Sequence, residues 1–336
     1  MDTPVEADSI PWQRADTDWF RDCRWGVFIH YLTGVATTAD EWNRRVDAFD
    51  VSALADQLAS VGAPYLGFTL GQNSGHYCAP NATYDRIVGI QPSKCSRRDL
   101  IADLSAALAP RGIRMLAYLP SGAPDQDAIA KERLHWQWGF SAGWGSKTTG
   151  LRLAEFQGLW ESVIREWSLR WGRNVRGWWI DGCYFAEDMY RFPEPPNFRS
   201  FAQALKAGNP DSIVAFNPGV KVPVICHSEF EDYTAGELSG DLPIGAFGLS
   251  DNPAFCNFGP IKRWVNGAQF HVLNFLGPWW SQSPPRLPTD LVVGYTRHVN
   301  ACDGVVTWDV PTSPTGRIPE PFMEQLRALG QAARRR

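Results

Sequence analysis

The sequence alternates between short apolar segments and longer amphipathic ones. The apolar segments predict strands at 25–31, 64–70, 114–119, 177–181, 212–217, 222–230, 270–275 and 304–310. Apolar residues at i, i+3 and i+4 spacing predict helices at 51–61, 98–108, 151–171, 198–207, 290–302 and 320–333. Strands that alternate with helices pair in parallel through right-handed crossovers. This pattern over 336 residues predicts the α/β class, as a single-domain (β/α)8 TIM barrel.

The loops at one end of the predicted barrel are much longer than those at the other end. The helix-to-strand turn at Gly112–Ile113 is short, whereas the long segments 71–97 and 121–150 each follow a strand. Long loops at the carboxyl ends of parallel strands carry the function of such barrels. We expect residues 1–18 to form an N-terminal extension and residues 19–336 to form the catalytic barrel.

Charge, cysteine content and the absence of signature motifs exclude several classes of function. The net charge is −4 and the sole basic block is Arg334–Arg336, which argues against nucleic acid or an anionic membrane as a partner. The seven cysteines include no CxxC pair, so no zinc module or disulfide framework is indicated. Neither a nucleotide-binding glycine motif nor a membrane-length apolar run is present. We expect no metal and no cofactor.

The N-terminus does not read as a secretory signal, because its first residues are acidic and poor in apolar side chains. We therefore expect a cytoplasmic protein with free thiols. A secreted protein whose signal has been removed would have the same sequence pattern. The sequence leaves the oligomeric state open, a homo-oligomer included.

Asp181 ends the predicted strand Gly177–Asp181 and is followed by Gly182. A carboxylate in this position lies at the carboxyl edge of a parallel sheet, where the active sites of α/β proteins lie. An Asp that only caps a turn would have the same local sequence. Trp178 and Trp179 favour the functional reading, because adjacent strand residues point to opposite faces and one indole then lies beside Asp181. Sugar rings present apolar C–H faces that stack on indoles.

Other polar and aromatic side chains follow the remaining predicted strands. They are His30, Tyr31, Gln72, Asn73, His76, Tyr118, Asn217, Glu229, Glu231, Asp232, Glu237, Asn274, Trp279, Trp280, Trp308 and Asp309. Hydroxyl-binding groups mixed with aromatic platforms suit a carbohydrate ligand. Two carboxylates from different strands suit glycoside hydrolysis. The histidines lack the spacing of metal ligands.

Taken in order, four segments and the C-terminal region resemble the retaining α-L-fucosidases of glycoside hydrolase family 29. These regions are Trp19–His30, Glu41–Trp42, Trp178–Asp181, Asp232–Glu237 and Gly304–Pro319. The likeness covers most of the barrel and implies hydrolysis with retention of configuration. It implies that Asp181 is the nucleophile, that Glu237 is the acid/base and that His30 binds the sugar.

The strand ends and the resemblance together predict a set of substrate-binding residues. They are His30, Glu41, Trp42, Gln72, Asn73, His76, Tyr118, Trp179 and Asn217. We expect Trp179, Trp42, Tyr118 and His30 to line one cavity with Gln72 and Asn73. Glu229 and Glu231 lie nearer to the predicted strand end and remain alternatives to Glu237 as the acid/base.

The sequence also departs from the family. Where the family has a His-His-Asp-Gly-Phe run after the second strand, this chain has Gln72–His76, and Tyr31 replaces the tryptophan that follows the sugar-binding histidine. We expect no counterpart of the β-sandwich that many members append, so the likeness is to the catalytic barrel alone. Both carboxylates of the family motifs are present, whereas the sugar-binding residues differ from those of the family. This combination indicates a glycosidase whose sugar need not be fucose. A catalytically silent carbohydrate-binding barrel and another barrel enzyme, such as a lyase or isomerase, remain alternatives.

Overall fold

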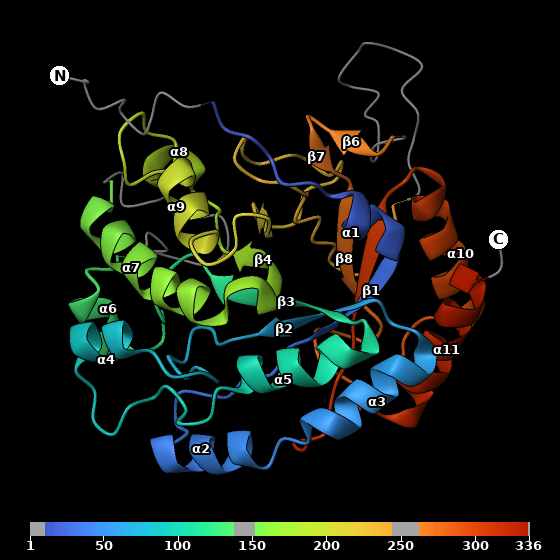
Figure 1. Ribbon diagram of the computed structural model, residues 1–336, viewed down its shortest axis with the longest axis horizontal. Helices are drawn as coiled ribbons and strands as arrows, with labels where there is room; N and C mark the ends of the chain where they lie inside the picture. Colours follow the sequence, from blue (N-terminus) through green and yellow to red (C-terminus); the bar gives the residue numbers. More distant parts are fainter. Residues whose placement is uncertain (1–10, 138–151, 244–261, 335–336) are drawn as a thin grey trace.

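The structure is a computed structural model that describes residues 11–137, 152–243 and 262–334. Its centre is a curled sheet of seven parallel strands in the order β5-β4-β3-β2-β1-β9-β8 (Figure 1). The strands are β1 (Trp25–Ile29), β2 (Tyr65–Thr69), β3 (Arg114–Pro120), β4 (Val175–Asp181), β5 (Ile213–Phe216), β8 (His271–Phe275) and β9 (Val305–Asp309). A small antiparallel pair, β6 (Trp264–Val265) and β7 (Ala268–Gln269), lies outside this sheet.

The segment 232–238 occupies the eighth position, between β5 and β8. The Asp232 amide donates to the carbonyl of Val214 on β5, and the Leu238 amide donates to the carbonyl of Leu273 on β8. Gly236 interrupts regular pairing, because its φ of 59° is left-handed and its backbone approaches the carbonyl of His271 too closely for a side chain. The seven strands and this segment close the predicted (β/α)8 barrel.

The strand predicted at 222–230 is wrong. This segment has no regular secondary structure, although it contains the apolar run Val222–Ile225. Pro223 lies within that run and has no amide hydrogen for pairing. The position in the barrel is taken instead by 232–238, where the alternation of polar and apolar residues runs only from Asp232 to Ala235 and ends at Gly236.

Helices surround the barrel, and six of them confirm predicted ones: α3 (Val51–Val61), α5 (Leu100–Leu108), α7 (Ala154–Trp171), α9 (Phe198–Leu205), α10 (Thr289–Ala301) and α11 (Glu320–Arg334). In Figure 1, α7 and α9 pack together on one side, and α10, α11 and α3 pack together on the other. Five short helices were not predicted: α1 (Asp18–Cys23), α2 (Ala39–Asp47), α4 (Ala82–Val88), α6 (Ala128–Arg133) and α8 (Ala186–Met189). Leu151, the predicted start of α7, lies outside the described residues.

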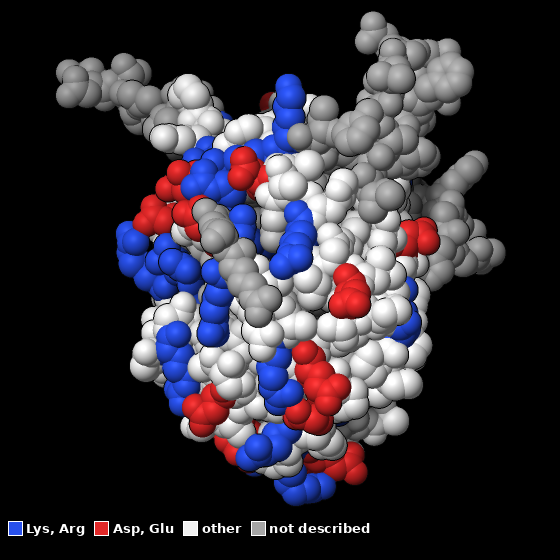
Figure 2. All heavy atoms as spheres, turned by 90° about the vertical axis from the view of Figure 1, so that its right-hand side faces the viewer, with Lys and Arg blue, Asp and Glu red and all other residues white. Residues whose placement is uncertain are grey.

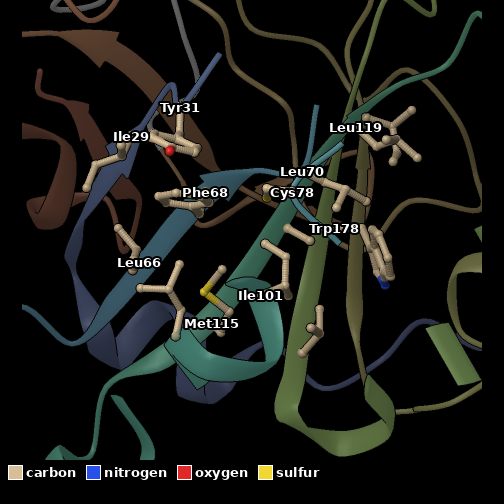
Figure 3. Close-up of a cluster of buried hydrophobic side chains, with 14 of the residues drawn as sticks. Ile29, Tyr31, Leu66, Phe68, Leu70, Cys78, Ile101, Met115, Leu119 and Trp178 are labelled. Carbon is tan, nitrogen blue, oxygen red and sulfur yellow. The ribbon is translucent and has the colours of Figure 1, made fainter. Parts of the chain in front are cut away.

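The barrel has an outer and an inner apolar layer, and adjacent residues of β4 contribute to different layers. Trp178 packs outside the sheet against Trp171 of α7, whereas Trp179 lies inside the barrel. Figure 3 shows part of the outer layer, which includes side chains of β1, β2 and β3 and Ile101 of α5. The expected opposite orientation of the two indoles is therefore observed, and it places Trp179 on the same face as the cavity described below.

The N-terminal end of the barrel is closed by α1 and the residues before it. Phe20 of α1 inserts into the barrel and contacts the rings of Tyr65, Tyr233 and His271. The amide of Ala15 donates to the Asp232 carboxylate over 2.6 Å. Residues 11–17 are thus attached to the barrel, and residues 1–10 of the expected extension lie outside the described residues.

The remaining features of the described regions concern surface charge, helix length and cysteines. On the face seen in Figure 2, acidic and basic side chains are interspersed rather than segregated, in keeping with the small net charge. No helix in the described ranges has the length and apolar character needed to cross a lipid bilayer. The cysteines that the structure describes are free thiols.

Candidate active site

A cavity of about 870 Å³ opens at the carboxyl ends of the strands. Its volume lies within the range of about 300–1,000 Å³ typical of small-molecule sites. Seven of the eleven predicted catalytic and substrate-binding residues line it, namely His30, Gln72, Asn73, Tyr118, Trp179, Asp181 and Glu237. The cavity therefore brings together side chains that are far apart in the sequence.

Asp181 is the last residue of β4, and its carboxylate is surrounded by hydrogen-bond donors. One oxygen accepts from the Gly182 amide and the Asn217 side chain, each over 2.8 Å, and from the Tyr184 hydroxyl over 3.3 Å. The other oxygen accepts from the Tyr118 hydroxyl over 2.6 Å. Ionised carboxylates accept but cannot donate, and these surroundings match that property. The donors fix the carboxylate in one orientation at the cavity wall.

Glu237 lies opposite, on the segment 232–238. This segment pairs with Leu273 of β8, which fixes the backbone of Glu237 at the cavity. Burial, followed by the negative charge of Asp181, raises the pKa of the Glu237 carboxyl to about 7. The hydrogen bond from Asn217 and the nearby His30 act in the opposite direction and lower this pKa. Glu237 thus retains a proton at pH values where an exposed glutamate is ionised.

Asn217 joins the two carboxylates. Its Nδ2 donates one hydrogen bond to Asp181 over 2.8 Å and one to Glu237 over 2.7 Å. Its backbone is held between neighbouring segments, since its amide donates to Ile180 and its carbonyl accepts from Cys183. The side chain is completely buried behind the carboxylates. Asn217 was predicted as a sugar ligand, and the structure places it instead as the shared donor of the carboxyl pair.

The opposite wall is built around His30 and Asp309. The imidazole Nδ1 of His30 lies 2.6 Å from one oxygen of Asp309, and the other oxygen accepts from the Ser281 amide over 2.6 Å. Asp309 ends β9 and is buried, so it orients the imidazole and holds the loop after β8. A histidine whose one nitrogen is fixed by a carboxylate presents its second nitrogen in a defined direction.

An aromatic pair forms the floor of the cavity. Tyr118 and Trp179 stack with their ring centroids 5.4 Å apart and an interplanar angle of 15°. The Trp179 indole donates to the carbonyl of Ala235 over 3.0 Å, and Gln72 donates to the Tyr118 hydroxyl. Gln72 also reaches Asp181 over 3.4 Å. Gln72 therefore faces the Asp181 carboxylate, as expected for a residue that replaces one of the family's histidines.

Besides Asn217, three predicted sugar-binding residues do not line the cavity. Glu41 is exposed on α2, where it forms a capping box with Thr38. Trp42 is buried and donates to the carbonyl of Tyr77, and His76 is buried against the Trp42 ring. The prediction that Glu41, Trp42 and His76 line the cavity is therefore wrong. Glu41 caps a helix, and Trp42 and His76 are buried side chains.

The alternative acids, Glu229 and Glu231, also lie away from the cavity. Glu229 is exposed. Glu231 is completely buried and accepts hydrogen bonds from the backbone amides of Phe216 and His227, and burial raises its pKa to about 8. Of the three glutamates considered, Glu237 alone lines the cavity beside Asp181.

Several lining residues were not predicted as site residues. Tyr184, Arg45, Asp125 and Trp136 line the cavity, and so do Trp279 and Trp280 on the loop after β8. Trp279 and Trp280 are among the strand-end residues, but nothing in the sequence marks the others. Arg45 lies on the unpredicted helix α2, and Asp125, Trp136 and Tyr184 come from long loops without a repeating pattern. In the described ranges, no cluster of three or more His, Cys, Asp or Glu side chains is placed to bind a metal ion.

Comparisons with known proteins find no matching family model and no matching curated protein. Solved structures match over nearly the whole chain. An endo-fucoidan hydrolase of glycoside hydrolase family 107, MfFcnA9, superposes with a TM-score of 0.69 at 16% identity, covering 94% of this chain and 63% of that one. A second, MfFcnA4, superposes with a TM-score of 0.67 at 16% identity, covering 94% of this chain and 53% of that one.

A GH29 α-L-fucosidase from Bacteroides thetaiotaomicron also matches, with a TM-score of 0.59 at 15% identity, and the match covers 98% of this chain and 76% of that one. The chain thus spans between half and two thirds of the two fucoidan hydrolases and three quarters of the fucosidase. At these identities the likeness is one of fold. The chain has the barrel fold of these glycoside hydrolases.

Proposed function

We propose that the protein is a retaining glycoside hydrolase that cleaves α-linked fucosides or closely related sugars. The observation that carries this proposal is the pair Asp181 and Glu237, held by one amide of Asn217. The Nδ2 atom of Asn217 lies 2.8 Å from one oxygen of Asp181 and 2.7 Å from one oxygen of Glu237, so these two oxygens are at most the sum of those distances apart. This limit is compatible with the separation of about 5–5.5 Å between the carboxyl groups of retaining enzymes. An inverting enzyme needs about 6.5–9.5 Å to admit a water molecule.

The two carboxyl groups divide the chemistry. Asp181 attacks the anomeric carbon, and the bond from that carbon to the leaving oxygen breaks while Glu237 gives its proton to the oxygen. The sugar is then an ester of Asp181. Glu237, now ionised, takes a proton from water, whose oxygen attacks the anomeric carbon and releases Asp181. A protein that only binds carbohydrate has no need of a proton-holding glutamate beside a second carboxylate.

The choice of sugar rests on the neighbours and on the cavity wall. The similar structures are of fucoidan hydrolases and α-L-fucosidases, and one is a covalent intermediate of a GH29 α-L-fucosidase trapped with 2-fluoro-fucosyl fluoride. His30, Gln72 and Asn73 supply hydrogen-bonding groups for sugar hydroxyls, and Trp179 with Tyr118 supplies an aromatic surface. We propose that these residues hold the sugar whose bond is cleaved.

A substrate screen tests the proposal. Wild-type protein is incubated with nitrophenyl glycosides of different sugars and with fucoidan oligosaccharides, and Asp181→Asn protein serves as the control. We expect release of nitrophenol from the α-L-fucoside or from an α-glycoside of related configuration. Activity on no glycoside, or equal activity in the Asp181→Asn protein, contradicts the proposal.

The pH dependence of the reaction is expected to report the protonation of Glu237. Because its pKa is raised to about 7, the acid is protonated below that pH, and kcat/KM falls as the pH rises through it. Asn217→Ala removes a bond that lowers this pKa, so the alkaline limb is expected to move to higher pH. We also expect kcat/KM to fall by about 10²-fold as the carboxyl pair loses its shared donor.

The measurement is a pH profile of kcat/KM for wild-type and Asn217→Ala protein on the same aryl glycoside. An unchanged limb would mean that Glu237 is not the group that titrates. Thermal unfolding of both proteins at one pH separates a loss of stability from a shift of the profile.

A further inference from the structure

A tryptophan at the outer edge of the cavity has no role in the chemistry proposed above. Trp279 lines the cavity, yet its side chain is 49% exposed. Single exposed apolar side chains are common on protein surfaces, but an indole that is half exposed and also lines a cavity offers its aromatic face to a ligand in that cavity. The next residue, Trp280, lies deeper and packs on the His30 ring, with centroids 5.2 Å apart.

The exposed indole is held in place rather than free to turn away. Its ring packs on Phe275 of β8 with centroids 5.4 Å apart, and its carbonyl accepts from the Gln282 amide. The same loop is attached to Asp309 through the Ser281 amide. Since Asp309 also fixes His30, one carboxylate sets the position of the loop that carries Trp279 relative to the sugar-binding wall. A platform fixed in this way costs little conformational entropy when a ligand stacks on it.

The size of the cavity indicates what packs there. Its 870 Å³ is near the upper end of the range of about 300–1,000 Å³ for small-molecule sites, which leaves room for more than one sugar ring. The inner part holds Asp181, Glu237 and His30, so a second ring has to lie toward the opening. A pyranose ring offers an apolar C–H face, and an indole face is its natural partner.

We infer that Trp279 forms a leaving-group subsite, and that the natural substrate carries a second sugar ring stacked on this indole. This inference rests on the proposed function, because it assigns the group that departs when the glycosidic bond breaks. Trp279 is then a specificity-determining residue that favours oligosaccharides over glycosides with a small leaving group.

The experiment compares two substrates that differ in the leaving group alone. One is an α-L-fucosyl disaccharide, whose leaving group is a sugar ring, and the other is α-L-fucosyl fluoride, whose leaving group has no ring. Trp279→Ala is expected to lower kcat/KM for the disaccharide by about tenfold or more, as for loss of one aromatic stacking contact. The fluoride is expected to react within about twofold of the wild-type rate, and Trp279→Phe is expected to recover most of the disaccharide activity.

Trp264 provides a matched control. It is also 49% exposed, but it lies on β6, does not line the cavity and packs on Arg263. Trp264→Ala is expected to change neither substrate's kcat/KM. Affinity is measured as well, by calorimetry in an Asp181→Asn background, where Trp279→Ala should weaken binding of the disaccharide and not that of fucose.

The outcomes distinguish failure of the proposed glycosidase function from failure of the leaving-group subsite at Trp279. If the substrate screen identifies a related sugar in place of fucose, both compounds are made with that sugar. If the wild-type protein cleaves neither compound nor any glycoside of the screen, the proposed function fails and the inference fails with it. If it cleaves the fluoride but not the disaccharide, or if Trp279→Ala leaves disaccharide cleavage unchanged, the inference alone is overturned. An equal loss on both substrates also overturns it, because Trp279 would then act on the cleaved sugar or on the fold.

Discussion

Asp181→Asn is expected to remove essentially all turnover, by on the order of 10⁴-fold or more, on every glycoside the wild-type protein cleaves. The physical reason is that no covalent intermediate forms without the carboxylate. The amide occupies the same volume at the end of β4, but one of its groups becomes a donor among the donors from Tyr118, Gly182 and Asn217. The measurement is kcat/KM on an activated aryl glycoside, for which even a low residual rate is detectable.

Asp125→Asn is the matched control, because Asp125 lines the same cavity without a hydrogen bond to Asp181. Its carboxylate accepts from the Trp136 indole and pairs with Lys131, so its loss is expected to cost no more than about tenfold. If Asp181→Asn retains activity close to that of Asp125→Asn, Asp181 is not the nucleophile.

Glu237→Ala is expected to have an effect that depends strongly on the leaving group. With a sugar leaving group, loss of the acid is expected to lower kcat/KM by about 10²–10⁴-fold, because the departing oxygen then leaves without a proton. With a dinitrophenyl or fluoride leaving group, which needs no proton, the first step is expected to proceed. External azide should then attack the glycosyl ester and yield a glycosyl azide of retained configuration.

The control variants for this prediction are Glu229→Ala and Glu231→Ala. Glu229 is exposed, and its loss should leave activity unchanged. Glu231 accepts from two buried amides, so Glu231→Ala is expected to destabilise the fold without giving any glycosyl azide. Azide rescue of Glu231→Ala, or unchanged cleavage of a sugar leaving group by Glu237→Ala, would assign the acid to another residue.

The sequence predicts those parts of the site that belong to regular strands. An apolar strand that ends in a carboxylate identifies Asp181, and alternation along β4 places Trp178 and Trp179 on opposite faces. His30, Gln72 and Tyr118 follow or end neighbouring parallel strands, so their convergence at one edge follows from the topology alone.

The sequence is much less informative where the backbone is irregular. Glu237 lies on a segment whose regular pairing is broken at Gly236, and the buried Asp232 carboxylate attaches the start of this segment to the Val214 amide of β5. The alternation of polar and apolar residues in this segment ends at Gly236, so it is a weak strand signal. The apolar run Val222–Ile225 therefore favours a strand at 222–230, which the structure does not contain. The predicted strand end indicates Glu229, Glu231 and Glu237 alike, and the resemblance to family 29 favours Glu237 among them.

Interactions that depend on three-dimensional packing were missed for a different reason. The bridging role of Asn217 requires knowledge of where two carboxylates meet, and the sequence contains only the residue types. Glu41, Trp42 and His76 carry groups that suit a sugar, yet a helix cap and core packing use them instead. Side-chain chemistry is necessary for a site, but the topology decides which side chains reach it.

The central claim is that Asp181 forms a covalent bond to the sugar, and one labelling experiment tests it most directly. The wild-type protein is incubated with 2-fluoro-fucosyl fluoride, digested, and its peptides are analysed by mass spectrometry. A 2-fluoro-fucosyl ester on Asp181, at one label per protein and absent from the Asp181→Asn variant, is the predicted result. Turnover of a fucoside without any labelled peptide, or a label on another carboxylate, would contradict the account.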